Sequence, residues 1–374
     1  MGVARWQTDL MPRGLIALAL CAVVLAAAPA GAKTGVAGLP ASGDADRVTV
    51  VFTGDTLIHL PLSARAWTGE SYNFQPMFSL VRPIISDADL AICHLEVPLS
   101  PGSDDLSGYP NFNAPREVAD ALAWAGYDGC STASNHSFDR GPEGVAQTID
   151  VLQAAGLAQA GMSGTADSGW VAAVYDLGDL RISHVSATYW LNGYQMPTGE
   201  QWYVQLLDKD EILAIAAREK RSGSDLVVVS VHCCVEYQHE PTAAQRELYR
   251  ELIASRDVDL VVSHHSHVIG PVEEVDGEYI LHGLGNFLSV QRHIPAVADG
   301  IIAQVEAVRR GAGWSFDAVE FVPTWVQPGT YRVLPALFHQ PDSYRRTMGV
   351  LGMYGGAALP LVWSGFPGYR LPEI

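Results

Sequence analysis

Five short segments of this chain place acidic, amide or imidazole side chains directly after apolar runs. The segments are G-D-T-L-I-H at 54–59, H-L-E at 94–96, S-N-H-S-F-D at 134–139, V-H-C-C-V-E at 231–236 and S-H-H-S-H at 263–267. Carboxylate oxygens, an amide oxygen and several imidazoles together suit one or two transition-metal ions. These residue types indicate the site of a metal-dependent hydrolase.

The apolar runs in front of four of these segments are short and mostly β-branched, which predicts buried strands. The runs are 48–52, 90–93, 226–231 and 258–262. Helix-like segments lie between the runs, so strands and helices alternate along most of the chain. Side chains that follow successive buried strands of such a sheet converge on one crevice at its edge.

The first two segments each supply one carboxylate. Gly54 should let the backbone turn so that Asp55 faces the crevice; the alternative is a solvated turn aspartate. His59 is a second candidate ligand if a helical turn begins at Asp55, and otherwise a neighbour that makes a local hydrogen bond. A buried Glu96 is costly unless it is paired, protonated or metal-bound, and a position between two cations would account for it. His94 is expected to be a neighbour of the ligands.

The third segment combines a ligand with a candidate catalytic group. Asn135 offers an amide oxygen to a hard metal ion, and His136 beside it can reach a substrate. Asp139 could accept a hydrogen bond from the His136 ring and fix its tautomer. The alternative is an Asx-turn that caps the helix after Gly141.

The last two segments supply imidazoles. His232 ends the most apolar strand run, and Glu236 follows in the next loop. His265 and His267 are predicted to share one side of an extended segment, because alternate residues of a strand point to the same face. His264 would then face the other way, and its role stays open.

Capping and breaking residues predict the helices between the strands. Helices are expected at 114–125 and 143–155, each ended by a glycine, at 209–221 with Asp208 as N-cap, and at 243–254 with Thr242 as N-cap. Segments 301–308 and 314–322 are predicted to form an antiparallel hairpin. The remainder, 326–374, is rich in Pro, Gly and aromatic residues and is expected to be an irregular C-terminal extension.

Residues 1–32 are predicted to form a secretory signal peptide, followed by a linker at 33–46. Arg5 and Arg13 precede an apolar stretch at 14–28, and small residues at 28–32 offer a cleavage site. The stretch is shorter than the roughly 20 residues of a spanning helix. The protein is therefore expected to be exported, to the periplasm or outside the cell; the alternative is an uncleaved membrane anchor.

Composition restricts the partners. The chain has 41 acidic and 23 basic residues and a formal net charge of −18. Such a surface disfavours nucleic acid and anionic lipid, which depend on Lys and Arg to neutralise phosphates. Four cysteines follow the signal segment, at positions 93, 130, 233 and 234. They are too few to build a disulfide framework; an oxidising compartment permits a bridge, but the sequence does not choose among the pairings.

The ordered set of segments, together with L-G-N-F at 284–287, resembles the CapA/PgsA family of capsule-synthesis proteins over 47–322. That family looks like a branch of the calcineurin-like metallophosphoesterases. The resemblance implies one domain at 47–325 of the α/β class: a metallophosphatase-like four-layer α/β/β/α sandwich with mixed sheets and a two-metal site. It also implies an association with poly-γ-glutamate or another envelope polymer, and with membrane partners in capsule synthesis.

By the same resemblance, six side chains are metal ligands and His136 assists catalysis. The implied ligands are Asp55, Glu96, Asn135, His232, His265 and His267, with Glu96 bridging two ions. The chain also departs from the family pattern. His94 stands where Asn is usual, Cys233-Cys234 replaces Trp-Gly, and Ser134 and Ser263 stand where Asn and Gly are expected. The wall beside His232 is thus altered, so the substrate class is not transferred.

The sequence predicts an exported, metal-dependent phosphoesterase-like protein that holds one or two divalent ions of manganese, iron or zinc. Its substrate would be an envelope polymer or a phosphoester, and no residue is assigned to substrate binding. Two alternatives stay open. One is a non-catalytic protein that binds or assembles the polymer, and the other is a metal-dependent hydrolase of γ-glutamyl amide bonds.

Overall fold

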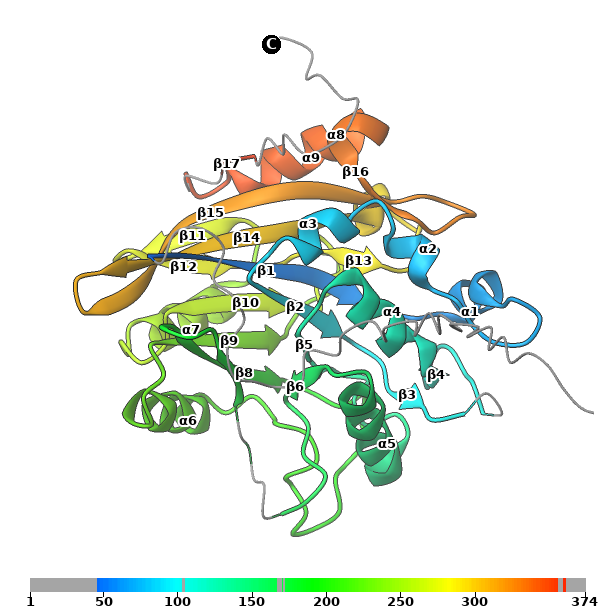
Figure 1. Cartoon of the computed structure of the whole chain (residues 1–374), viewed down its shortest axis with the longest axis horizontal. Coiled ribbons are helices and arrows are strands. Elements are labelled where there is room, and N and C mark those ends of the chain that lie inside the picture. The colour runs from blue at the N-terminus through cyan, green and yellow to red at the C-terminus, as the bar shows by residue number, and fades with distance from the viewer. Residues whose placement is uncertain (1–45, 103–104, 167–169, 171, 356–358, 361–374) are drawn as a thin grey trace, which may run out of the picture. The chain divides into compact units, whose positions relative to one another are not determined.

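The computed structural model describes residues 46–102, 105–166, 170, 172–355 and 359–360 (Figure 1). The expected signal peptide at 1–32 and nearly all of the expected linker lie outside these residues. Within the described part of the chain, no helix is both long and apolar enough to cross a bilayer.

The first sheet is mixed and contains strands from both ends of the chain. Its main path runs β16-β15-β14-β1-β2-β5-β6, with β13 paired to β1 and β17 paired to β15. Strand β1 is parallel to β2 and β13 and antiparallel to β14. The strands are β1 Arg47–Thr56, β2 Leu90–Leu95, β5 Gly129–Ser131, β6 Ala158–Ala160, β13 Asn286–Leu288, β14 Asp299–Arg310, β15 Gly313–Val326, β16 Val333–Pro335 and β17 Leu359–Pro360. The predicted hairpin is β14 and β15.

The second sheet has the order β11-β12-β10-β9-β8-β7, with a parallel centre formed by β8, β9, β10 and β12. Its strands are β7 Ala173–Asp176, β8 Arg181–Thr188, β9 Leu226–His232, β10 Leu260–His264, β11 Val272–Val275 and β12 Glu278–Leu281. A separate short pair joins β3 Leu99–Ser100 to β4 Ala114–Pro115.

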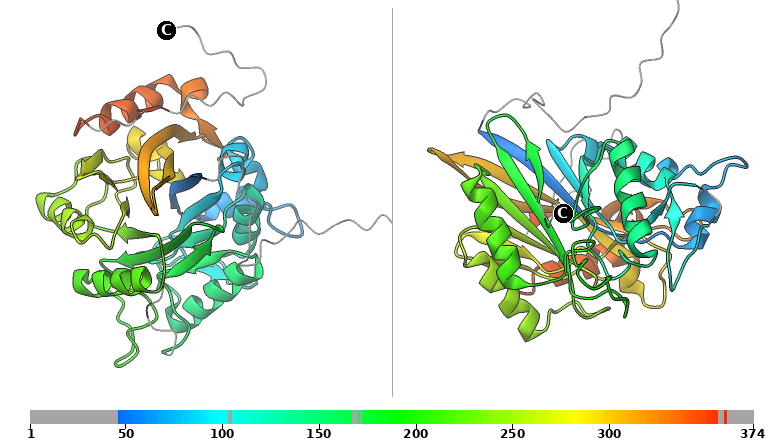
Figure 2. Two further views of the ribbon diagram at one scale, coloured as in Figure 1. Left: turned by 60° about the vertical axis from the view of Figure 1, so that its left-hand side comes forward. Right: turned by 90° about the horizontal axis from the view of Figure 1, so that it is seen from below.

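The two sheets pack face to face, with helices on their outer faces (Figures 1 and 2). Val50 and Phe52 of β1 belong to the same apolar cluster as Val228 and Val262 of the second sheet, whereas Val51 packs with the helices. The helices on the first sheet are α1 Leu60–Ala66, α2 Gln75–Phe78, α3 Arg82–Ser86, α4 Glu117–Ala125 and α5 Gly141–Ala154. Helices α6 Lys209–Arg221 and α7 Ala243–Ile253 cover the second sheet. The expected four-layer α/β/β/α sandwich with mixed sheets is confirmed.

The capping signals place the helix ends correctly. Gly126 ends α4 in the left-handed conformation, with φ of 107°. The Asp208 side chain accepts a hydrogen bond from the backbone N–H of Glu211, and Thr242 does the same for Gln245 at the start of α7. These bonds satisfy backbone donors that have no partner within the helix.

The described part of the C-terminal segment is not the irregular cover expected from its composition. After β16 it forms α8 Ala336–His339 and α9 Pro341–Leu351. Thr347, Val350 and Leu351 of α9 are buried, which gives this helix an apolar face against the sandwich. Arg346 pairs with the buried Asp299 at the start of β14, with Nε to Oδ2 at 2.7 Å. The Pro and Gly residues around this helix made its amphipathic pattern hard to recognise from the sequence.

Two disulfides answer the pairing that the sequence left open. Cys93 of β2 is bonded to Cys130 of β5, and Cys233 is bonded to its neighbour Cys234. Cys93 and Cys130 occupy paired positions on adjacent parallel strands.

Gly54 positions Asp55, although not by the expected turn. Strand β1 continues through Gly54 to Thr56. A Cβ atom at residue 54 would lie 2.0 Å from the carbonyl oxygen of Gly285, whereas the Asp55 N–H donates to that oxygen at 2.8 Å. The glycine is needed because two backbone segments approach each other closely beside Asp55.

We therefore expect Gly54→Ala to lower the free energy of unfolding by about 1–3 kcal/mol, the usual cost of overpacking a core. Gly313→Ala is the matched control, because its Cβ would meet no atom within 4 Å. That control should change stability by less than about 0.5 kcal/mol. Urea unfolding followed by circular dichroism measures both, and equal stability of the two variants would contradict the close-contact argument.

Candidate metal centre

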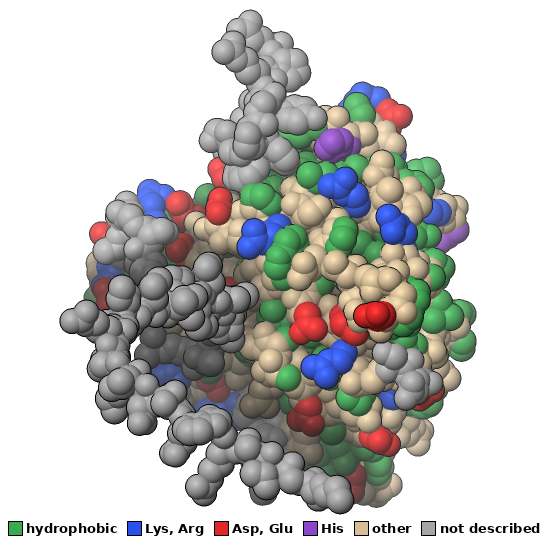
Figure 3. Space-filling view, turned by 45° about the vertical axis from the view of Figure 1, so that its right-hand side comes forward, with side chains coloured by type: hydrophobic (Ala, Val, Ile, Leu, Met, Phe, Trp, Pro, Cys, Tyr) green, Lys and Arg blue, Asp and Glu red, His purple; other side chains and the backbone are tan. Residues whose placement is uncertain are grey.

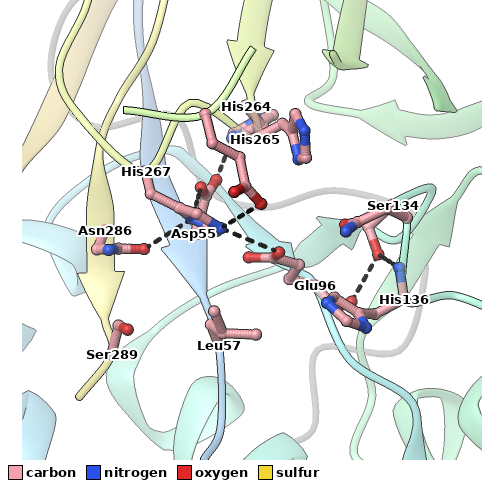
Figure 4. Close-up of polar contacts among 12 residues, drawn as sticks. Asp55, Leu57, Glu96, Ser134, His136, His264, His265, His267, Asn286 and Ser289 are labelled. Carbon is pink, nitrogen blue, oxygen red and sulfur yellow. Dashed lines mark hydrogen bonds and ion pairs between the residues drawn. The ribbon is translucent and has the colours of Figure 1, made fainter. Parts of the chain in front are cut away.

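The functional side chains gather where strands of both sheets end. Asp55 lies near the end of β1, Glu96 directly follows β2, and Asn135 and His136 follow β5. His232 ends β9, and His265 and His267 follow β10. Figure 4 shows Asp55, Glu96 and His267 pointing toward one another. Neither sheet alone supplies the complete set.

Asp55 is surrounded by imidazoles. Its Oδ2 lies 3.0 Å from Nδ1 of His267, and its Oδ1 lies 3.3 Å from Nδ1 of His264. Burial opposes a charge on Asp55, but His264 and His267 outweigh this effect and hold the pKa of Asp55 below its usual value. Asp55 is therefore a carboxylate at neutral pH and can bind a cation. The candidate metal-binding groups among the described residues are Asp55–His94–His264 and Asp55–Glu96–His267.

Glu96 is the most unusual group in the site. Its side chain is fully buried, and neither carboxylate oxygen has a hydrogen-bond partner. Burial raises the pKa of Glu96 to about 8, against the effect of His267, whose Nε2 lies 3.7 Å from Oε1. The pKa of His267 is raised to about 9, because Glu96 and Asp55 outweigh the opposing effect of burial. A divalent cation would satisfy the two oxygens, so this group fits a metal.

A second cluster centres on His232. Its Nε2 lies 2.8 Å from Oδ1 of Asn135 and 3.0 Å from Nδ1 of His265, while its Nδ1 lies 2.9 Å from Nε2 of His94. Burial lowers the pKa of His232 and lowers that of His265 to about 3. Both rings are therefore neutral at physiological pH, which is the form that ligates a metal.

Hydrogen bonds around this cluster orient its acceptor atoms. The Asn135 amide nitrogen donates to Oδ1 of Asn192 at 3.2 Å, so the Asn135 oxygen faces His232. Ser131 Oγ donates to the Cys93 carbonyl and accepts from Nδ1 of His94, whose Nε2 then accepts from Nδ1 of His232. In this arrangement the His232 Nε2 lone pair and the Asn135 oxygen face each other, and a cation suits two such acceptors.

His136 has the partner that the sequence predicts. Its Nδ1 lies 2.7 Å from Oδ2 of Asp139, which also accepts from the Phe112 N–H at 2.7 Å. The imidazole packs edge-on against the Phe112 ring, with centroids 4.6 Å apart. Asp139 and Phe112 thus fix the ring, and its Nε2 remains for a substrate. Figure 4 places His136 beside Ser134, near Glu96.

His59 is not brought into the metal-binding groups. Helix α1 begins at Leu60, so no helical turn starts at Asp55. The His59 Nδ1 instead lies 3.1 Å from the carbonyl oxygen of Leu57, and its ring packs edge-on against Phe112. Burial lowers the pKa of His59 to about 4.

The extended geometry expected for residues 265–267 is wrong. Strand β10 ends at His264, and His265 and His267 have φ of 84° and 54°. The left-handed backbone turns both rings toward the site. His264 was expected to face away, but it lies beside Asp55 and stacks on His94 at 3.9 Å between ring centroids.

The sequence reasoning assigned no role to three further neighbours of the site. Asn286 Oδ1 lies 3.1 Å from Nδ1 of His267, and its place in the L-G-N-F segment was a usable signal. Tyr189 OH lies 3.3 Å from Nε2 of His265, and Asn192 Nδ2 lies 3.2 Å from Nδ1 of His136. Both belong to the loop after β8, where no sequence pattern marked them.

Several solved structures resemble the chain at low sequence identity. The calcineurin-like phosphoesterase YfkN from Bacillus subtilis has a TM-score of 0.49 and 9% identity, covering 81% of this chain and 98% of that one. A putative 5'-nucleotidase from Staphylococcus aureus has a TM-score of 0.48 and 14% identity, covering 81% of this chain and 58% of that one.

Sequence relatives and a family model show the family to which the chain belongs. The capsule biosynthesis protein CapA of Bacillus anthracis is 23% identical over 340 residues, which are 88% of this chain and 80% of that protein. The PGA biosynthesis protein CapA of Bacillus subtilis is 25% identical over 250 residues, 63% of this chain and 62% of that protein. The family model described as bacterial capsule synthesis protein PGA_cap matches residues 49–291, which include every predicted ligand. Because this match spans more than half of the sequence, the chain belongs to the bacterial capsule synthesis protein family PGA_cap.

Proposed function

We propose that this protein is an exported, metal-dependent phosphoesterase that acts on a phosphoester used in the synthesis or processing of an envelope polymer. The observation that carries the proposal is Glu96, a buried carboxylate with two unpartnered oxygens beside Asp55 and His267. In its charged form such a group needs a compensating cation, because burying an uncompensated charge costs several kcal/mol. The proposed metal is a divalent ion of manganese, iron or zinc.

In this proposal Asp55, Glu96 and His267 hold one ion, and Asn135, His232 and His265 hold a second. Bound divalent ions supply an activated water and polarise the phosphoryl oxygens. His136 keeps one proton at Nδ1 for Asp139 and can carry another at Nε2. The Asp139 carboxylate holds the ring in place, so that His136 can give the Nε2 proton to the departing alcohol oxygen.

The link to the cell envelope is supported by the names of the relatives, which refer to capsule and PGA biosynthesis. Poly-γ-glutamate or a similar polymer, and membrane partners in capsule synthesis, are the proposed associates. Export is supported by the charged and apolar start of the sequence. On the face shown in Figure 3, Lys and Arg lie singly or in small groups among acidic and uncharged side chains.

We expect His136→Ala to retain the metals and to lower turnover of a phosphoester by roughly 10²- to 10⁴-fold, the usual contribution of a positioned general acid. Asp139→Asn should lower turnover less, by loosening the imidazole. His339→Ala, on α8, serves as a control with unchanged turnover. Metal content by elemental analysis and kinetics on a panel of phosphoesters and γ-glutamyl amides measure these effects.

The same panel separates the alternatives. If metal loading and turnover both collapse in His136→Ala, His136 is a ligand and its proposed role is wrong. Turnover of γ-glutamyl amides alone would favour an amide hydrolase. A fully metal-loaded wild type that hydrolyses neither class would favour a polymer-binding protein.

Metal uptake should release protons at pH 7. The pKa values of about 8 for Glu96 and about 9 for His267 mean that the metal-free pair holds extra protons at that pH. A cation must displace them, so metal affinity should rise as pH increases from 6 to 8. Calorimetric titration in two buffers of different ionisation enthalpy measures the number released. A value of zero would contradict the protonated state of the pair.

The mature protein should start near residue 31 or 33 and leave the cytoplasm. N-terminal sequencing of the protein recovered from a producing bacterium, after separation of membrane and soluble fractions, tests this. Recovery in the membrane fraction with Met1 or Gly2 at the start would instead support the anchored form.

A further inference from the structure

The loop that follows β9 carries a carboxylate outside the proposed ligand set. Glu236 lies in this loop, and its side chain is 41% exposed. The loop is fixed against the His267 segment, because the N–H of Tyr237 donates to the Ser266 carbonyl at 2.7 Å. The Tyr237 ring also lies 5.9 Å from the His267 ring and 4.4 Å from the His293 ring, between centroids. Glu236 is therefore held beside His267.

Asn286 determines which nitrogen of His267 is free. The Asn286 amide nitrogen lies 2.9 Å from both Oε1 of Gln291 and the carbonyl oxygen of Val297, so its own oxygen faces Nδ1 of His267. That Nδ1 faces two acceptors, Asn286 Oδ1 at 3.1 Å and Asp55 Oδ2 at 3.0 Å, and must carry the proton. The neutral ring then has its lone pair on Nε2.

Two carboxylates face this nitrogen. Glu96 Oε1 is 3.7 Å and Glu236 Oε1 is 3.9 Å from Nε2 of His267. Both distances are too long for a hydrogen bond. Glu96 has no hydrogen-bond donor at either oxygen, although it is fully buried. Asp55, Glu96 and His267 form a donor set for a divalent cation, because their ligand atoms all lie within 4.8 Å of one another. Glu236 faces the same Nε2 lone pair, and its 41% exposed side chain can turn toward an ion bound there.

We propose that Glu236 is a direct ligand of the ion held by Asp55, Glu96 and His267, and that this ion is a hard cation of the Mn²⁺ type. The inference rests on the metal site of the proposed function and adds its fourth protein ligand and its metal class. Three carboxylates and one imidazole form an oxygen-rich set, which favours Mn²⁺ over metals that prefer sulfur or nitrogen ligands. The second cluster, with two imidazoles and an amide oxygen, does not include Glu236.

The test is Mn²⁺ binding to the metal-free full-length protein, by calorimetric titration and by the electron paramagnetic resonance signal of free Mn²⁺. Glu236→Gln removes the charge at nearly constant size. Loss of even an indirect partner of a metal typically costs 10- to 100-fold in affinity, so one Mn²⁺ site should weaken by about 100-fold while the other is unchanged. Glu240→Gln is the matched control: Glu240 lies in the same loop but accepts from Tyr354 OH at 3.4 Å.

Unfolding midpoints of the metal-free proteins separate loss of a ligand from loss of the fold, and should be equal in wild type and Glu236→Gln. If the Gln variant unfolds early, Glu236→Asp replaces it, and the retracted carboxylate should still weaken one site. Unchanged Mn²⁺ binding in a folded Glu236 variant would overturn this inference and leave the metal site intact. A wild type that binds no Mn²⁺ or Zn²⁺ would overturn both the inference and the proposed function.

Discussion

Moving a carboxylate from water into a protein interior costs several kcal/mol, unless a nearby positive charge compensates for the lost hydration. Glu96 is subject to this constraint, because neither of its oxygens has a hydrogen-bond partner. Much of the surrounding structure places groups that can compensate its charge. Asp55 and His267 lie close enough to share a cation with it, Glu236 lies beside His267, and His264 and Asn286 orient the nearest members of the group. Protonation of Glu96 gives the metal-free protein a second way to avoid an isolated charge. The site is therefore linked to pH through the same carboxylate that would bind the ion.

Two sheets are needed because no single strand edge presents enough ligands. The first sheet provides Asp55, Glu96 and the Asn135–His136 pair, and the second provides the imidazoles of His232, His265 and His267. Close backbone packing brings them into register. Gly54 allows the Gly285 carbonyl to approach β1 beside Asp55. The apolar cluster between the sheets then holds the two halves at a fixed separation.

Much of this arrangement could be predicted from the sequence. Short apolar runs that end in Asp55, Glu96 and His232 mark the strand ends, and Asp208 and Thr242 mark helix starts through local hydrogen bonds. These signals lie within a few residues of the feature that they predict. The Asp139–His136 contact was also accessible, because the two residues are three positions apart.

Other features depend on contacts across the whole chain. His267 meets Asp55 across 212 positions, and its backbone conformation after β10 departs from the strand pattern that alternate residues suggest. Asn192 and Tyr189 reach the site from a loop with no periodicity, and nothing in the sequence singled them out. The pairing of Cys93 with Cys130 follows from the adjacency of β2 and β5, which is a property of the assembled sheet. Helix α9 was missed because composition outweighed its short amphipathic pattern.

The salt bridge between Arg346 and Asp299 bears on the order in which the chain is made. Asp299 begins β14, the strand beside β1, and Gly300 bridges to Gly285, whose carbonyl binds the N–H of Asp55. The position of Asp55 thus depends on residues that are synthesised long after it. Arg346, which pairs with Asp299, is among the last of these residues. A growing chain on the ribosome contains the early ligands such as Asp55 before it contains the later strands that position them. If the N-terminal segment directs export of the chain before it folds, the centre would be completed after translocation, and the ion would be drawn from the metals available outside the cytoplasm.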